Sequence, residues 1–406
     1  MTRHERSEPE AVPADWDRSG LPAWTYHSRA LLALEMSEVF LTHWQIAGHV
    51  ADIPRAGDHI AFDIGNERVL VIRGQDGIVR AMHNLCRHRG ARLVTGAHGH
   101  CSNALVCPFH GWVYNFDGTL RGAARPKSYG TLDRADFALA PIESEIWNGF
   151  IFVRLNPGPQ PAVARWLAPF DEDAKAYDFA GLVPAGEFTG QELPVNWKSV
   201  RDVDNEGYHV AMAHPALQDL YGAGYEDQVL ADGLSRSIGR YNAHAGRRPS
   251  VRAYVGLAPE AAWLPAEKRR QWAYYGTFPN GVIAAAPETV QFYQEFPVDT
   301  DRTFIRGRTY RRPNEDRRTR IARYLARRID RETYEEDIAL SIASNDAMKS
   351  AAFTGFHLSD LEYGVRRHHD RLRALLPVVE LPEPPAEADM AHLNGLLSGR
   401  PGPQRF

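Results

Sequence analysis

Two short runs in the first third of the chain each contain one cysteine and one histidine. They read Cys86-x-His88 and Cys107-x₂-His110, and eighteen residues separate His88 from Cys107. Two thiolates and two imidazoles can hold a tetrahedral zinc ion, or a [2Fe–2S] cluster with both cysteines on one iron and both histidines on the other. Zinc sites usually place like ligands at close spacing. Here each close pair is mixed, which suits two loops that hold a two-iron cluster from opposite sides.

This arrangement resembles the Rieske cluster-binding motif, and the glycine and aromatics around His110 fit it as well. The resemblance implies that Cys86 and Cys107 bind the inner iron, while His88 and His110 bind the outer one. A zinc knuckle, or four residues that bind nothing, is the alternative. The third cysteine of the chain, Cys101, belongs to neither pair.

Composition places the chain among ordinary globular proteins and excludes several classes of partner. A length of 406 residues predicts two domains, and a net charge of −4 gives no reason to expect nucleic acid or an anionic membrane as a partner. Three cysteines exclude a disulfide framework, which indicates a reducing compartment. We see neither a signal peptide nor an apolar run of about 20 residues, so we expect a cytoplasmic protein.

The pattern of apolar residues predicts an α+β fold with four parts. Short β-type runs separated by breaks such as Asp76-Gly77 and Asp117-Gly118 predict a small all-β domain that carries both Cys/His loops. Beyond it, an antiparallel meander over 281–310 and long helices over 314–349 and 361–376 predict a larger domain. The expected parts are an N-terminal segment and helix packed on the larger domain (1–40), the all-β domain (41–157), the larger domain (158–378) and a Pro-rich exposed tail (379–406).

A second dense group of polar residues lies between Asp202 and Pro215. His209 and His214 are five residues apart and would diverge by about 140° on a regular helix. Pro215 disfavours the helical conformation of His214, so the helix should end there and the second imidazole can turn back. Two imidazoles and one carboxylate would form the facial site of a non-haem Fe(II) enzyme. Two unrelated histidines at a helix end are the alternative.

Taken with the upstream motif, this group resembles the alpha subunits of ring-hydroxylating Rieske non-haem iron oxygenases. The order of parts matches that family from about Leu21 to Pro377. The resemblance implies a helix-grip catalytic domain in which an aspartate on a late helix is the third iron ligand. Asp337, in the run Glu-Glu-Asp-Ile, fits that position, with Asp346 as the reserve and a solvated surface charge as the alternative.

The resemblance also assigns a catalytic role to acidic residues just before His209. The family has a carboxylate three residues before the first iron histidine, which links it to a cluster histidine of the neighbouring subunit. Here that residue is Glu206, whereas most members have aspartate. Oxygenases of quaternary ammonium compounds also have glutamate, but follow it with cysteine, where this chain has Gly207. We place Asp202 beside Glu206 in the catalytic group.

Together these features predict the terminal oxygenase of a multicomponent system. Electrons from NAD(P)H would arrive through a separate flavin/iron–sulfur reductase or ferredoxin, because the chain has no GxGxxG turn for a nucleotide of its own. With O₂, the enzyme would hydroxylate, dihydroxylate or oxidatively demethylate a small aromatic or quaternary ammonium compound. The resemblance implies a head-to-tail homotrimer, with or without a beta subunit. A Rieske-type electron carrier with a non-catalytic second domain is the rival interpretation.

Overall fold

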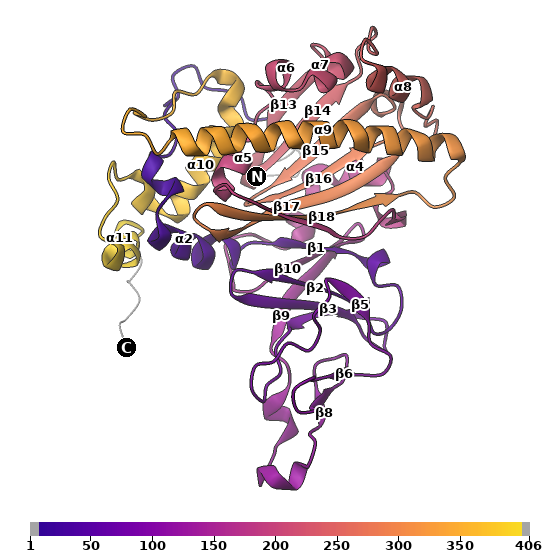
Figure 1. The fold of residues 1–406 in the computed structure, drawn as a ribbon, viewed down its shortest axis with the longest axis vertical. Helices are drawn as coiled ribbons and strands as arrows, with labels where there is room; N and C mark the ends of the chain where they lie inside the picture. The colour runs from indigo at the N-terminus through magenta and orange to yellow at the C-terminus, as the bar shows by residue number, and fades with distance from the viewer. Residues whose placement is uncertain (1–7, 400–406) are drawn as a thin grey trace.

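The N-terminal part of the chain forms two antiparallel sheets. In the computed structural model, which describes residues 8–399, the larger sheet has the strand order β1-β10-β9-β4-β3-β2-β5. Its strands are β1 (Gln45–His49), β2 (Asp58–Ile64), β3 (Glu67–Arg73), β4 (Val79–His83), β5 (His98–His100), β9 (Pro141–Trp147) and β10 (Phe150–Arg154). The smaller sheet lies at the far end of the molecule (Figure 1) and comprises β6 (Leu105–Val106), β7 (Val113–Tyr114) and β8 (Leu120–Gly122). The expected all-β region is confirmed.

Turn residues explain where these strands end. The Asp76-Gly77 break separates β3 from β4, and the Asp117-Gly118 break separates β7 from β8. Gly77 and Gly118 have φ of 79° and 89°, a left-handed conformation that glycine adopts without steric cost.

The second domain is built on an eight-stranded antiparallel sheet. Its order is β11-β18-β17-β16-β15-β14-β13, with β12 paired to β18. Its strands are β11 (Val183–Pro184), β12 (Thr189–Leu193), β13 (Tyr225–Val229), β14 (Leu234–Arg240), β15 (Gln271–Thr277), β16 (Gly281–Ala286), β17 (Thr289–Asp299) and β18 (Arg302–Arg311). The predicted meander is therefore correct and corresponds to β16, β17 and β18.

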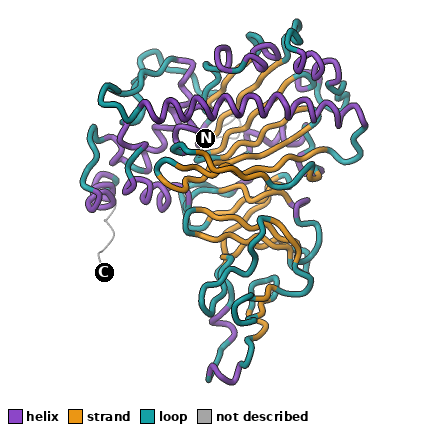
Figure 2. The backbone as a smooth tube through the Cα atoms, viewed as in Figure 1, coloured by secondary structure: helices purple, strands orange, loops and turns teal. Residues whose placement is uncertain are grey.

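The two faces of this sheet have different neighbours because side chains alternate along each strand. Tyr275 and Ile283 belong to a core that also contains Phe150 and Phe152 of β10. Tyr274 and Val282, one residue away on the same strands, face a cavity on the other side. Helix α9 (Arg317–Ala347) crosses that second side, and most other helices surround the same sheet (Figures 1 and 2).

Three sequence expectations differ from the structure or extend beyond it. The N-terminal helix is divided into α2 (Arg29–Glu35) and a π-helical turn (Met36–Phe40). The part of the expected exposed tail that the structure describes, up to residue 399, is mostly exposed, but it contains α11 (Met390–Leu397) and buries Met390 in the core with Leu31. Residues 400–406 lie outside the described residues. Among the described helices, none has the length and apolar character that crossing a bilayer requires.

Candidate metal centres and active site

The two Cys/His loops have the same backbone conformation. In each loop the cysteine N–H donates to the carbonyl five residues later, and the glycine four residues later donates back to the cysteine carbonyl, with N···O distances of 2.8 and 3.0 Å. Those glycines, Gly90 and Gly111, have φ of 78° and 68°. Such turns point several backbone N–H groups towards the loop interior, where they can donate to thiolate sulfur. The loops therefore form a matched pair around Cys86 and Cys107.

The side chains of these loops converge and leave ring nitrogens without partners. Cys86 and Cys107 are each 2% exposed. The rings of His88 and His110 lie 4.7 Å apart, centroid to centroid, and each has a buried Nδ1 that makes no hydrogen bond. A buried polar atom without a partner is costly, and metal coordination would remove that cost. Two thiols and two free ring nitrogens fit a [2Fe–2S] cluster.

The Tyr114 side chain contacts the loop that contains Cys86. Its hydroxyl lies 3.4 Å from the Cys86 Sγ and accepts a hydrogen bond from the Arg87 N–H at 2.9 Å. Burial raises the pKa of the Cys86 thiol. A thiolate at this position therefore requires a compensating positive charge, which iron would supply.

Cys101 tests the assignment of the ligands. It is partly buried, and its Sγ lies 3.9 Å from Nδ1 of His59, on the β2–β5 side of the domain. We expect Cys101→Ser to retain the visible absorption of a Rieske cluster, because this thiol belongs to neither loop. The measurement is the absorption spectrum of the purified variant, together with its iron and sulfide content. A folded variant that lacks this absorption would show that the cluster ligands are assigned wrongly.

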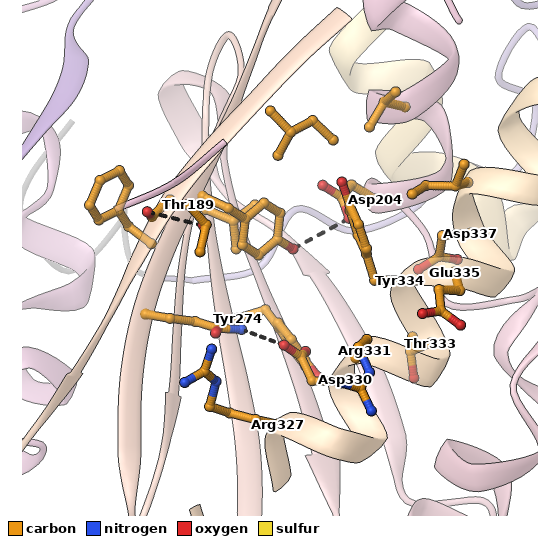
Figure 3. A pocket seen from close by; sticks show the side chains of 18 of the residues that line it. Thr189, Asp204, Tyr274, Arg327, Asp330, Arg331, Thr333, Tyr334, Glu335 and Asp337 are labelled. Atoms are coloured by element: carbon orange, nitrogen blue, oxygen red, sulfur yellow. Dashed lines mark hydrogen bonds between the residues drawn. The ribbon is translucent and has the colours of Figure 1, made fainter. Parts of the chain in front are cut away.

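A cavity of about 920 Å³ lies between α9 and the catalytic sheet. Its walls combine carboxylates with aromatic side chains, and Figure 3 shows Asp330, Tyr334 and Asp337 along the helix that forms one wall. Tyr274 and Tyr293 contribute from the sheet. The cavity is large enough for a small-molecule substrate.

The two histidines enter this cavity from the connection after α5 (Trp197–Asp204). His209 precedes the short helix α6 (Val210–Ala213), and His214 separates α6 from α7 (Pro215–Tyr221). Pro215 occupies the first turn of α7, and His214 has the non-helical values φ −117° and ψ 79°. The predicted helix end at His214 is therefore present, and it redirects the second imidazole.

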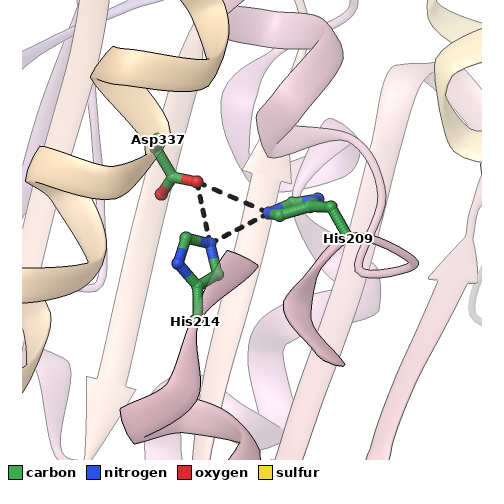
Figure 4. A group of neighbouring side chains, drawn as sticks. All are labelled: His209, His214 and Asp337. Atoms are coloured by element: carbon green, nitrogen blue, oxygen red, sulfur yellow. Dashed lines mark hydrogen bonds and ion pairs between the residues drawn. The ribbon is translucent and has the colours of Figure 1, made fainter. Parts of the chain in front are cut away.

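His209, His214 and Asp337 meet at one point (Figure 4). The His214 Nε2 lies 2.8 Å from Asp337 Oδ1, and the His209 Nε2 lies 3.4 Å from the same oxygen. The two Nε2 atoms are 3.1 Å apart. Three ligand atoms of these types within 4.8 Å of one another match a 2-His-1-carboxylate site for Fe(II).

Each imidazole also has a carboxylate on its other nitrogen. Glu206 Oε1 lies 2.5 Å from the Nδ1 of His209, and Glu336 Oε2 lies 2.8 Å from the Nδ1 of His214. A proton held on Nδ1 leaves the Nε2 lone pair free for a metal, so these carboxylates fix the required tautomer. The contact of Glu206 with His209 lies within one chain; a contact with a neighbouring subunit stays a prediction.

Sequence reasoning missed Glu336. Glu336 directly precedes Asp337 on α9. Successive helical residues are about 100° apart, so a long glutamate can still reach round to a histidine ring beside the ligand. The signal that could have found it is the Glu-Glu-Asp run, which places carboxylates directly beside the predicted ligand.

Opposite charges shift the pKa values of this group. Although burial opposes the charged imidazole, hydrogen bonds to Asp337 and Glu206 raise the pKa of His209 to about 10. Burial also disfavours the charged imidazole of His214, but hydrogen bonds to Asp337 and Glu336 raise its pKa. Although burial alone would raise the pKa of Asp337, contacts with the two imidazoles lower it. The carboxylates thus favour positive charge at the position where the ligand atoms meet. A divalent cation would supply that charge and displace the protons.

Two other carboxylates named from the sequence lie elsewhere. Asp202 accepts hydrogen bonds from the Tyr26 hydroxyl at 2.6 Å and from Nε2 of His369 at 2.9 Å, so it anchors α5 to other elements. Among the described residues, those lining the cavity do not include Asp202, and its placement in the catalytic group stays a prediction. Asp346, the reserve ligand, has a side chain that is 79% exposed and lies 3.6 Å from the Lys349 ammonium.

Asp204, rather than Asp202, faces the cavity. Residues two apart on a helix differ in direction by about 200°, so only one of this pair can point inward. Asp204 lies 3.1 Å from the Arg201 guanidinium, which is also 3.5 Å from Glu295. Burial raises the pKa of Asp204, and it raises that of Glu295 to about 8 despite Arg201. This part of the cavity wall therefore places two carboxyl groups beside one guanidinium.

Gly207 separates this chain from the pattern expected of quaternary ammonium oxygenases. A Cβ at residue 207 would overlap the ring of Tyr225, which lines the cavity. The Gly207 N–H also donates to Asp227 at 2.7 Å. A cysteine would require Tyr225 to move, so glycine here follows from local packing.

Two family models match the chain in this order of parts. Residues 43–133 match the Rieske [2Fe–2S] domain, and residues 173–377 match the ring hydroxylating alpha subunit (catalytic domain). The chain belongs to the family of ring-hydroxylating alpha subunits. As in the expected Rieske oxygenase alpha subunit, the cluster loops fall within the first match and the histidine pair and Asp337 within the second.

Curated relatives of this alpha subunit include enzymes named for quaternary ammonium compounds. It is 38% identical over 197 residues to the glycine betaine monooxygenase oxygenase subunit of Pseudomonas aeruginosa (strain UCBPP-PA14), covering 48% of this chain and 45% of that protein. It is 32% identical over 210 residues to the chloroplastic choline monooxygenase of Atriplex hortensis, covering 50% and 47%. The match thus spans about half the length of these relatives.

The alpha subunit also has the fold of a solved quaternary ammonium Rieske monooxygenase. The TM-score is 0.75 at 22% sequence identity, over 90% of this chain and 99% of that one. This likeness confirms the α+β fold class.

Proposed function

We propose that this alpha subunit is the terminal oxygenase component of a multicomponent system and oxidises quaternary ammonium compounds. The observation that carries the proposal is the convergence of His209, His214 and Asp337 in the wall of a 920 Å³ cavity. The Cys/His loops of the same chain provide a site for a redox cluster. An oxygenase needs both sites, and an electron carrier needs only one.

The residues of this chain would divide the work as follows. His209, His214 and Asp337 would hold a mononuclear Fe(II), which activates O₂ when bound, and the Cys86/His88 and Cys107/His110 loops would hold the [2Fe–2S] cluster that supplies electrons. Glu206 and Glu336 orient the two imidazoles. The cavity holds the substrate beside Asp337 and separates it from bulk water.

The preference for a quaternary ammonium substrate is supported by the cavity and by the relatives. Asp204 and Glu295 lie in the wall with one arginine between them, and Tyr274 and Tyr293 are close by in the same wall. Carboxylates and tyrosine rings both attract a cation. The two relatives described above carry the names of glycine betaine and choline, which share a trimethylammonium group.

Electron delivery is the reason for proposing an assembly. The cluster loops adjoin β6 in the lower part of Figure 1, and α9, the helix that contains Asp337, crosses the upper part. We therefore propose a head-to-tail homotrimer in which the cluster of one subunit serves the iron site of the next. A separate NAD(P)H-dependent reductase or ferredoxin would reduce the cluster.

Metal analysis and turnover together test the proposal. We expect about three irons and two acid-labile sulfides per chain, because one mononuclear iron adds to a two-iron cluster. With a surrogate reductase, trimethylammonium compounds should stimulate coupled NADH and O₂ consumption, and the products identify hydroxylation or demethylation. Two irons and two sulfides, with no stimulation by any substrate, would instead support the electron carrier.

A further inference from the structure

The first half of α9 presents a strongly basic surface to the cavity. Five arginines of this helix line the cavity within twelve residues: Arg320, Arg323, Arg327, Arg328 and Arg331. Asp337 lies further along the same helix, so the arginines and the iron ligand occupy different positions along one cavity (Figure 3).

Two of these arginines are available to a ligand. Arg323 is hydrogen-bonded to Glu315, Arg320 lies 4.0 Å from the same carboxylate, and Arg328 pairs with Glu332 at 3.5 Å. Within residues 8–399, neither Arg327 nor Arg331 has a carboxylate at ion-pair distance.

The deeper arginines of the cavity are already engaged. Arg306 donates to the carbonyls of Ile46 and Ala47 at 2.8 and 2.9 Å. Arg308 lies 3.3 Å from the buried carboxylate of Asp52. An anionic group of a ligand would therefore be held by Arg327 and Arg331.

Helix geometry gives the distance from these arginines to the iron ligand. At 1.5 Å per residue, Arg331 and Arg327 lie about 9 and 15 Å before Asp337 along α9. Helical side chains lean towards the N-terminus, and because this applies to Asp337 as well as to both arginines, the separation of the charged groups along the helix stays close to these values. In glycine betaine only two bonds separate the ammonium nitrogen from the carboxylate carbon, and an extended chain advances about 1.2 Å per bond. Glycine betaine is therefore too short to place its ammonium group beside Asp337 and its carboxylate beside Arg327 and Arg331.

We propose that the cavity takes an elongated substrate, with the group to be oxidised beside Asp337 and an anionic group held by Arg327 and Arg331. The cavity volume is near the upper end of the range that holds drug-sized ligands, about 300–1,000 Å³. Apolar side chains such as Val203, Val282 and Ile338 contribute wall for a linking chain. The end that is oxidised follows from the proposed function; the anionic end follows from the α9 arginines alone.

Binding of matched ligands to the purified full chain tests this inference. The probes are glycine betaine, an ω-trimethylammonio carboxylate with about nine methylenes, the alkyltrimethylammonium of equal length without a carboxylate, and the fatty carboxylate of equal length without the ammonium. We expect calorimetry to give at least tenfold tighter binding for the long zwitterion than for glycine betaine. The Arg327→Gln/Arg331→Gln double variant should lose about tenfold affinity for both long carboxylates, as expected for charge-assisted hydrogen bonds, and less than twofold for the alkylammonium.

Arg317→Gln is the matched control, because Arg317 is exposed on the same helix but does not line the cavity. It should bind all four probes as the wild type does. Equal loss for the alkylammonium in the double variant, equal binding of glycine betaine and the long zwitterion, or no binding of either long carboxylate would overturn the inference. If only the fatty carboxylate binds, and binds through the two arginines, the anionic end is retained and the quaternary ammonium part of the proposed function is wrong.

Discussion

Replacing Asp337 by alanine is expected to remove the mononuclear iron and to spare the cluster. Iron should fall from about three to about two per chain, with sulfide and the visible spectrum unchanged. Among residues 8–399, Asp337 Oδ1 is the one carboxylate oxygen within ion-pair distance of both Nε2 atoms, at 2.8 and 3.4 Å. Two neutral imidazoles alone bind Fe(II) poorly. Substrate-dependent O₂ consumption should fall by more than the 10- to 100-fold that losing an outer-shell partner costs.

Asp346→Ala is the matched control for this substitution. Asp346 lies on the same helix, is largely exposed and pairs only with Lys349 among the described residues. Its loss should change neither iron content nor activity. Full iron and full activity in the Asp337 variant, or a specific loss of iron in the Asp346 variant, would show that the late helix supplies a different ligand.

The sequence was most informative where chemistry requires particular residue types at short spacing. The Cys/His loops, the histidine pair and the helix break before Pro215 could all be predicted, because each depends on residues close together in the chain. The helical span around Asp337 was also predicted, since a 31-residue helix gives a long periodic pattern.

The sequence was less informative where helix rotation or distant packing decides. Asp202 and Asp204 look equivalent in the sequence, yet the position of α5 turns one towards Tyr26 and the other into the cavity. Contacts such as Glu336 with His214 join residues 122 positions apart, and the Glu-Glu-Asp run alone does not say which histidine its glutamates reach. The buried Met390 was missed because Pro and Glu in the same segment predict an exposed tail.

The charge pattern of the cavity links these observations to function. Carboxylates surround the position of the iron ligands, and arginines occupy the outer part of α9. Because negative charges near a cation site stabilise the cation, the inner part favours iron and a cationic group. The outer part favours an anion, so the cavity as a whole is complementary to a molecule with opposite charges at its two ends.

Glu206→Gln is expected to retain both metals but to slow electron transfer by about 10²-fold. Glu206 accepts from the backbone N–H of His209 at 3.1 Å through one oxygen, and its other oxygen lies 2.5 Å from the Nδ1 of the same residue. An uncharged amide can keep one acceptor for the imidazole, so iron should stay bound. It cannot accept through both ends, which a link from His209 to a cluster histidine of a neighbouring subunit requires. Glu206→Asp should also slow electron transfer, because its side chain is about 1.5 Å shorter and leaves a gap in the link.

The Glu336→Gln variant distinguishes an effect on electron transfer between subunits from an effect on the orientation of an imidazole ligand. Glu336 has the same kind of contact with the other imidazole, at 2.8 Å from the Nδ1 of His214, but no part in the proposed link between subunits. The measurement is single-turnover reoxidation of the pre-reduced cluster after O₂ and substrate are added to iron-replete enzyme. Glu336→Gln should reoxidise at nearly the wild-type rate, and both Glu206 variants should reoxidise slowly. Wild-type rates in both Glu206 variants would limit Glu206 to orienting His209, and equal slowing by Glu336→Gln would assign the effect to imidazole orientation rather than to a path between subunits.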